Sequence, residues 1–416
     1  MDRFQREVDR ALDALGVDRA APVLVACSGG PDSAALAHAA MALASAGRLG
    51  PVTLCHVDHR LRPDSARDGE LVAALAASGG AGSVTVAVDV PRDRGSLEAA
   101  AREVRYRALF AVAAERRARA ILVAHTARDQ VETVLMRLLR GTGVAGLAGI
   151  PARRDLIARP LLAMTREAVE DYVRTHAIPI ADDPSNRDVR HARNQVRLEV
   201  LPALRRMNPS VDAALLRLAA AAGEARAALD YAAALLAESA RQPGGGWRAD
   251  ILAGAPSAVL AQFFAAEVAA AGGGPLTARH QDAIARLLAG SGTGRVDLPG
   301  LTAWREYDLL RLEPPGTAEP ASPSLEVTGP DGPYEVRPWR PGDRMRPVRL
   351  RGRSRKLSDL YIDARVPRRL RDRARVVTRA SDGQIEWAEH LGSAFGSRIA
   401  VVTLTPRESV ATNKKR

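Results

Sequence analysis

The stretch Val23–Ser33 constrains the fold of this chain more than any other. It opens with the apolar run Val-Leu-Val-Ala-Cys and ends in Ser-Gly-Gly-Pro-Asp-Ser, and Ala- and Leu-rich helical sequence follows. This pattern predicts a strand, a glycine-rich loop and the start of a helix. Such a loop suits a phosphate chain, because glycines let the backbone approach the anion and the helix N-terminus adds positive potential. The alternative is an ordinary strand-to-helix turn.

The loop supplies candidate phosphate ligands and one candidate metal ligand. Ser28 and Ser33 add hydroxyl donors, whereas a carboxylate at Asp32 belongs beside phosphates only if a cation lies between them, and Mg²⁺ favours such oxygen ligands. No Gly-Lys-Ser/Thr follows the loop, the first two-thirds of the chain contains no lysine, and the Gly-x-Gly-x-x-Gly spacing is missing. The residues expected to bind the phosphates are Ser28, Gly29, Gly30, Pro31, Asp32 and Ser33.

The first two hundred residues alternate strand patterns with helix patterns. The expected strands are 23–27, 51–57, 84–90 and 120–125, and the expected helices between and after them are 34–46, 64–78, 96–117 and 130–139. Strands separated by helices predict an α/β fold with a doubly wound parallel sheet. Ligands of such sheets bind at the carboxyl ends of the strands. Polar clusters fall at those ends, at 28–33, 56–62 and 125–132.

The rest of the chain predicts three further parts. Helical patterns cover 209–240, 255–271 and 277–288, followed by strand patterns at 295–298 and 302–312. Residues 314–324 are rich in Pro and Ser, which is typical of a linker. We therefore expect a catalytic domain over 1–208, a mostly helical domain over 209–313, the linker, and a small α+β domain over 325–416.

Composition limits the partners and the compartment. The 416 residues carry a formal net charge of +12, mostly from arginine, which favours nucleic acid as partner, although a GC-rich genome would also enrich arginine. The two cysteines, Cys27 and Cys55, each end an expected buried strand, so they predict core packing rather than a disulfide framework or a cysteine-only metal site. No apolar run approaches membrane-span length. We expect a cytoplasmic protein without a membrane segment.

Several clusters together resemble one family, the tRNA(Ile)-lysidine synthases of the N-type ATP pyrophosphatase (PP-loop) superfamily. The resemblance runs nearly end to end, and the order of the motifs is more specific than any one of them. The matching stretches are Ser28–Ser33, His56–Arg62, Ala101–Tyr106, His125–Thr133, Arg140–Gly143, Asp183–Asn186, Arg193–Arg197, Arg340–Arg344, Lys356–Asp359 and Val366–Arg368.

The resemblance implies a Rossmann-like PP-loop domain and an ATP-dependent C–N ligase. The family modifies the wobble cytidine, position 34, of an isoleucine tRNA whose anticodon is CAU. ATP adenylates O2 of the base and pyrophosphate leaves, and free L-lysine then attacks C2 and displaces AMP. The product, lysidine, pairs with A, so codon and amino-acid identity switch from Met to Ile. The implied cofactors are ATP and Mg²⁺; a homodimer is compatible with the sequence, which does not determine the oligomeric state.

The adenylation step needs cations at the phosphates. Arg105 or Arg102 meets this need, because arginine binds phosphate through two N–H groups. These two residues share one helix face, so a solvated surface is the alternative. We assign the catalytic role to Arg105, with Asp32 as the Mg²⁺ ligand.

The lysine step needs carboxylates to attract the ammonium group and accept its proton. Asp129 and Glu132 lie three residues apart at a helix start and face one side, although helix capping explains either one equally well. The matched motifs also mark His125, Asp183, Arg193 and Arg197 as substrate-binding candidates. The arginine-dense segment 340–379 is expected to bind tRNA, at its acceptor arm; a solvated basic surface is the alternative.

One residue departs from the family pattern, and the sequence disfavours two rival functions. The family usually has two adjacent acids before the Gln of the His125 motif, and here Arg128 replaces the first. A tRNA 2-thiocytidine synthetase is disfavoured, because that chemistry uses Cys-x-x-Cys pairs. A non-catalytic nucleotide- or RNA-binding module would not need Asp32, Asp129 and Glu132 together. His56, Asp58 and His59 have metal-like spacing, but we expect them to line the ATP site or to be structural.

Overall fold

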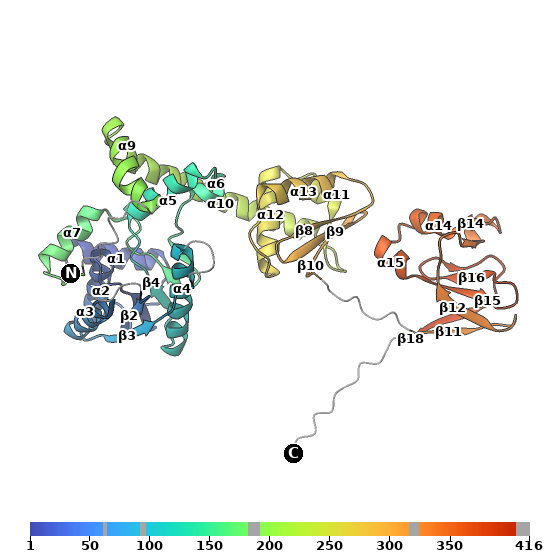
Figure 1. Ribbon diagram of the computed structural model, residues 1–416, viewed down its shortest axis with the longest axis horizontal. Coiled ribbons are helices and arrows are strands. Elements are labelled where there is room, and N and C mark those ends of the chain that lie inside the picture. The colour runs from blue at the N-terminus through green and yellow to red at the C-terminus, as the bar shows by residue number, and fades with distance from the viewer. Residues whose placement is uncertain (61–64, 92–96, 182–191, 316–323, 405–416) are drawn as a thin grey trace, which may run out of the picture. The chain divides into compact units, whose positions relative to one another are not determined.

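The computed structural model describes residues 1–60, 65–91, 97–181, 192–315 and 324–404 (Figure 1). The chain divides into two compact units, Met1–Ala227 and Ala228–Arg416, and the division falls inside the long helix α10 (Val211–Ala240). Among the described helices, none combines the length and the apolar character that crossing a membrane requires.

The first unit is built on a six-stranded sheet in the order β3-β2-β1-β4-β6-β5. Neighbouring strands run parallel, except that β5 is antiparallel to β6. The parallel order around β1 confirms the expected α/β fold. The strands are β1 Val23–Ala26, β2 Val52–Asp58, β3 Gly82–Ala87, β4 Ala120–Leu122, β5 Arg153–Arg154 and β6 Ile157–Ala158.

Helices cover both faces of this sheet (Figure 1). On one face the cores of α1, α2, α3 and α7 pack together with β1, and on the other face Leu109 and Val112 of α4 pack against Leu24 and Ile121. The central strands β1 and β4 are therefore buried on both sides, as is typical of a parallel sheet. The helices are α1 Arg3–Ala14, α2 Pro31–Ser45, α3 Ser65–Ser78, α4 Leu97–Glu115, α5 Ala127–Leu139, α6 Val144–Leu147 and α7 Arg166–Thr175.

A continuous helical segment after the parallel sheet packs on α5. It consists of α8 (Ala192–Gln195), the π-helix η2 (Val196–Val200) and α9 (Leu201–Met207). Val131 and Leu135 of α5 form a small core with Val196 and Leu201. Because Arg193 and Arg197 are carried by the same segment, this core brings two arginines to the N-terminal half of α5.

The second unit has two separate hydrophobic cores. The first joins α11–α13 to the antiparallel sheet β7-β10-β9-β8 and includes Trp247, Phe263 and Phe264. The second joins α14 and α15 to the antiparallel sheet β12-β15-β16-β17 around Tyr361. The helices are α11 Ala249–Ala253, α12 Ser257–Ala270, α13 Ala278–Ala289, η3 Val348–Leu350, α14 Leu357–Asp363 and α15 Arg368–Arg373. The strands are β7 Trp247–Arg248, β8 Thr293–Leu298, β9 Leu301–Glu306, β10 Leu309–Glu313, β11 Ser324–Thr328, β12 Tyr334–Pro338, β13 Arg344–Met345, β14 Arg355–Lys356, β15 Arg375–Arg379, β16 Ile385–Ala388, β17 Gly392–Ser393 and β18 Ala400–Leu404.

Some expected elements were wrong in detail. The strand expected over 302–312 is two strands, because the chain turns at Tyr307, whose φ is +55°, and pairs β9 with β10. The third strand runs over 82–87 rather than 84–90, and β2 continues to Asp58, so Cys55 lies inside a strand rather than at its end. Helices α2 and α5 each begin three residues earlier than expected, at Pro31 and Ala127, because the first turn lacks an apolar stripe.

Candidate active site

The glycine loop joins β1 to α2 through a backbone conformation that requires glycine. Gly29 has a φ of +87°, which strains any residue with a Cβ, and Gly30 is the extended N-cap of α2 without a side-chain cap. The Ser33 hydroxyl donates to the Gly30 carbonyl at 3.0 Å and accepts from the Ser28 N–H at 3.1 Å. Ser33 thus holds the loop closed, while the exposed Ser28 is accessible to a ligand.

Asp32 in the first turn of α2 carries an unfavourable charge. Burial, and after it the nearby Asp129 carboxylate, raise the pKa of Asp32 to about 6, against the opposing effect of Arg166 and Arg197. A cation at Asp32 would relieve this, so the residue fits a Mg²⁺ ligand. The described residues contain no group of three or more His, Cys, Asp or Glu side chains suited to a metal. Phosphate oxygens and water would have to complete the shell of Mg²⁺, which is how Mg²⁺ is usually held.

His125, which follows β4, is held as a neutral hydrogen-bond donor. The Arg159 Nε–H donates to His125 Nδ1 at 2.9 Å, so the ring proton must lie on Nε2. Burial, together with the smaller effect of nearby positive charges, lowers the pKa of His125 to about 3; those charges belong to Arg159, Arg102, Arg105 and Arg193. Several arginines therefore converge on one histidine, which is the electrostatic setting of an anion-binding site.

Asp129 has two functions at once in this site. Its Oδ2 accepts the Thr126 N–H at 2.8 Å and the Thr126 hydroxyl at 3.1 Å, which completes the cap of α5. Its Oδ1 accepts Nη2 of Arg193 at 2.6 Å. Asp129 therefore does cap the helix, and its side chain is still 19% exposed.

Glu132 is fully buried and surrounded by arginines. Its Oε1 accepts Nε of Arg128 at 3.1 Å and Nε of Arg197 at 2.7 Å. Its Oε2 accepts Nε of Arg193 at 2.7 Å and Nη2 of Arg197 at 3.1 Å. Hydrogen bonds between guanidinium groups and a carboxylate are charge-assisted, so they hold this side chain firmly in place. The expected contact of Glu132 with lysine stays a prediction.

Three of the other predicted residues are accounted for here, and one residue is added to them. Asp183 lies outside the described residues. His56 Nδ1 bonds the Cys27 carbonyl at 3.1 Å, and Asp58 Oδ1 accepts the Arg60 N–H at 2.8 Å, so both have structural partners. Arg159 was missed as a functional candidate. Arg159 follows strand β6, whose two residues are too few to show a strand pattern. The one sequence signal there is the Arg-Pro pair that Arg159 itself begins.

Comparison with known protein families assigns the class. Residues 1–204 match a family model described as a PP-loop domain, and residues 334–398 match one described as the TilS substrate C-terminal domain. The parallel sheet and the glycine loop at its first strand agree with the first match. The chain is thus a PP-loop ATP-binding protein with an added substrate domain.

Curated relatives narrow the class to a family. A tRNA(Ile)-lysidine synthase of Salinispora arenicola is 43% identical over 324 residues, which is 75% of this chain and 96% of the relative. One of Salinispora tropica is 43% identical over 71% of this chain and 91% of its own length. One of Thermus thermophilus is 39% identical over 84% of this chain and 65% of its own. The chain belongs to the tRNA(Ile)-lysidine synthase family and is an ATP-dependent ligase of that family.

Proposed function

We propose that this chain joins free L-lysine to C2 of the wobble cytidine, position 34, in the isoleucine tRNA whose anticodon is CAU. O2 of the cytidine attacks the α-phosphorus of ATP and pyrophosphate leaves; the lysine side-chain amine then attacks C2, loses a proton, and O2 departs with AMP. The observation that carries the proposal is the convergence of the glycine loop, Asp32 and the arginine-surrounded His125 at one edge of the sheet, in a chain of this family.

Residues around the loop serve the adenylation step. The N–H groups at the start of α2 and the exposed Ser28 bind the phosphates, and Arg105 neutralises the charge that develops on the oxygens. Mg²⁺ held at Asp32 supplies positive charge to the triphosphate when it is bound. The neutral His125 donates from Nε2, which suits a phosphate or carbonyl oxygen of the substrate.

Asp129 and Glu132 serve the lysine step. Asp129 is the accessible member, with a side chain 19% exposed, so it meets the incoming ammonium first and is placed to accept its proton. Glu132 is the buried member, and its carboxylate contacts the amine once Asp129 has attracted it. Arg193 and Arg197 hydrogen-bond these carboxylates and are assigned to contact the substrate as well.

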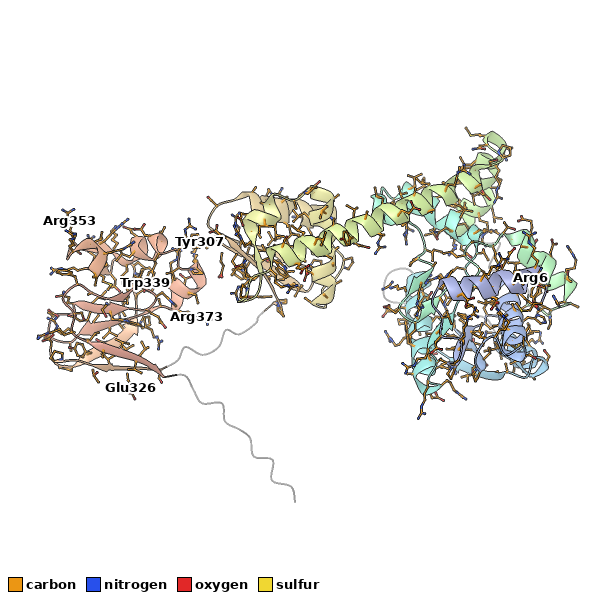
Figure 2. The ribbon with its side chains drawn as sticks, turned by 180° about the vertical axis from the view of Figure 1, so that it is seen from behind. Arg6, Tyr307, Glu326, Trp339, Arg353 and Arg373 are labelled. Atoms are coloured by element: carbon orange, nitrogen blue, oxygen red, sulfur yellow. The ribbon has the colours of Figure 1, made fainter. Side chains whose placement is uncertain are left out.

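The arginine-rich segment 344–353 binds the tRNA. Arg344, Arg346, Arg349, Arg351 and Arg353 are exposed within one short segment, and Arg353 stands at the surface of its part of the molecule (Figure 2). Clustered arginines bind phosphates without sequence preference, so this segment positions the tRNA while the first unit performs the chemistry. The same proposal includes three domains, over 1–208, 209–313 and 325–416, and a homodimer. It also includes a cytoplasmic location, where free lysine, ATP and tRNA meet.

Two measurements test the activity. Pyrophosphate release must require the CAU-anticodon tRNA, and mass spectrometry of the digested tRNA must show cytidine 34 gaining the mass of a lysine residue. Release that does not depend on the tRNA, or a tRNA that stays unmodified with lysine present, contradicts the proposal.

Asp129→Asn tests the lysine subsite, because the amide oxygen preserves the helix cap but removes the charge. We expect the lysine KM to rise about tenfold, which corresponds to about 1.4 kcal/mol, and adenylated tRNA to accumulate. Asp171→Asn, on the exposed face of α7, is the matched control. Equal losses in adenylation and in lysine transfer would assign Asp129 to ATP or to the fold instead.

A further inference from the structure

We propose that Arg128 occupies the amine subsite on Glu132 while lysine is absent and must leave it before lysine binds. Arg128 would then set the affinity for lysine without contributing to lysine's binding. This inference rests on the proposed function, in which Glu132 contacts the lysine amine. It also accounts for a basic residue at the position where an acid is expected.

The hydrogen bonds of Glu132 carry the first step of the argument. An ionised carboxylate offers about four acceptor positions. Described residues fill four: Arg128 and Arg197 on Oε1, and Arg193 and Arg197 on Oε2. Because the side chain of Glu132 has no exposed surface, a lysine ammonium can bond it only by replacing one of these donors.

Arg128 is the donor that is easiest to replace. Among the described residues it makes one hydrogen bond to Glu132, at 3.1 Å, whereas Arg197 makes two and Arg193 joins Glu132 to Asp129. Arg128 also lies on the same helix as Glu132, four residues earlier, so rotation about its side-chain bonds releases it without moving the backbone. Arg193 and Arg197 are fixed through the packing of η2 and α9 on α5.

A reason for such an occupant follows from burial. A buried carboxylate that loses a partner is costly, and the site must stay stable between turnovers. Arg128 keeps Oε1 paired when lysine is absent, and its partly exposed side chain (23%) has solvent to move into when the amine arrives. The exchange replaces one cation with another, so the charge around Glu132 does not change.

The size of the effect follows from competition. When a binding-competent state is populated only in part, the apparent affinity falls by that fraction. An arginine–glutamate contact four residues apart on a helix is favoured about twofold when exposed, and about tenfold when it is partly buried and charge-assisted. Removing Arg128 should therefore lower the lysine KM by about two- to tenfold.

The experiment measures lysidine formation against lysine concentration with the full chain at saturating ATP and tRNA. Arg128→Ala should lower the lysine KM by about two- to tenfold. Arg128→Lys, whose ammonium still reaches Glu132, should stay within about twofold of the parent. Arg3→Ala removes an exposed arginine from the pair Arg3–Glu7, which has the same four-residue spacing, and serves as the matched control. Calorimetric titration of lysine into the protein–tRNA complex gives an affinity that does not depend on the rate of either step.

The outcomes separate this inference from the proposed function. A lysine KM that is unchanged or raised in Arg128→Ala, or that falls equally in Arg128→Lys, overturns the occupancy of the subsite by Arg128. If Asp129→Asn raises the lysine KM while Arg128→Ala fails to lower it, only the inference is lost. If neither variant changes the lysine KM, the amine subsite itself lies elsewhere, and both proposals are lost.

Discussion

Asp32→Asn is expected to stabilise the ligand-free protein while it abolishes adenylation. The pKa of Asp32 is raised from 3.8 to about 6, so the folded state holds its proton more tightly than the unfolded state does. The ionised carboxylate therefore destabilises the fold above pH 6, and this cost disappears as the pH falls toward 3.8. A difference of about two pKa units corresponds to about 3 kcal/mol at pH 7.5, about 1.5 at pH 5, and less than about 1 at pH 4.

The assay must report on the first unit alone. All four tryptophans, Trp247, Trp304, Trp339 and Trp387, lie in the second unit, so their fluorescence does not follow the unfolding of the sheet beside Asp32. Hydrogen exchange measured by mass spectrometry on peptides from β1 and α2 gives the free energy of opening there. Asp155→Asn is the control. Asp155 is exposed and has a left-handed backbone conformation, which asparagine also tolerates, so this variant should change neither protection nor activity.

The two readouts must move in opposite directions. Protection in β1 and α2 should rise in Asp32→Asn at pH 7.5 and converge with the parent near pH 4, while tRNA-dependent pyrophosphate release falls at least about a hundredfold. If the variant is less stable than the parent at pH 7.5, or if its gain in stability does not depend on pH, the ionised Asp32 carboxylate does not destabilise the fold. Retained pyrophosphate release refutes the role of Asp32 as the Mg²⁺ ligand.

Two further predictions concern His125 and the arginine segment. Because burial and nearby arginines hold the pKa of His125 near 3, ¹⁵N NMR should find the ring neutral, with its proton on Nε2, from pH 5 to 8. The signals of His125 are assigned by their loss in His125→Asn. An imidazolium in that pH range contradicts the hydrogen bond from Arg159. The double variant Arg346→Ala, Arg353→Ala should weaken tRNA binding and lower the log–log salt slope by about two, one per lost phosphate contact, whereas Arg3→Ala should not; unchanged affinity and slope would place the tRNA contacts outside this segment.

Local patterns predicted the part of the fold that positions the ATP site. An apolar run followed by Ser-Gly-Gly-Pro-Asp-Ser can be recognised within eleven residues, because strand propensity, glycine freedom and helix capping all act between near neighbours. The same holds for the alternation of strands and helices that placed β1, β2 and β4 in a parallel sheet. Short elements escaped this reasoning: β5 and β6 are two residues each, and no periodicity is visible at that length.

The sequence alone determined the residue types of the glycine loop, the excess of positive charge and the alternation of strands and helices that predicts a parallel sheet, because each depends on composition or on neighbours in the chain. The order of the strands in that sheet came only from the structure. Only the tertiary structure decided which groups pair. Arg193 lies 61 residues from Glu132, and Arg159 lies 34 from His125, yet these contacts pair the buried carboxylate and fix the tautomer of the ring. Such partners are chosen by the packing of η2 and β6 against the sheet and α5, and packing has no local pattern in the sequence.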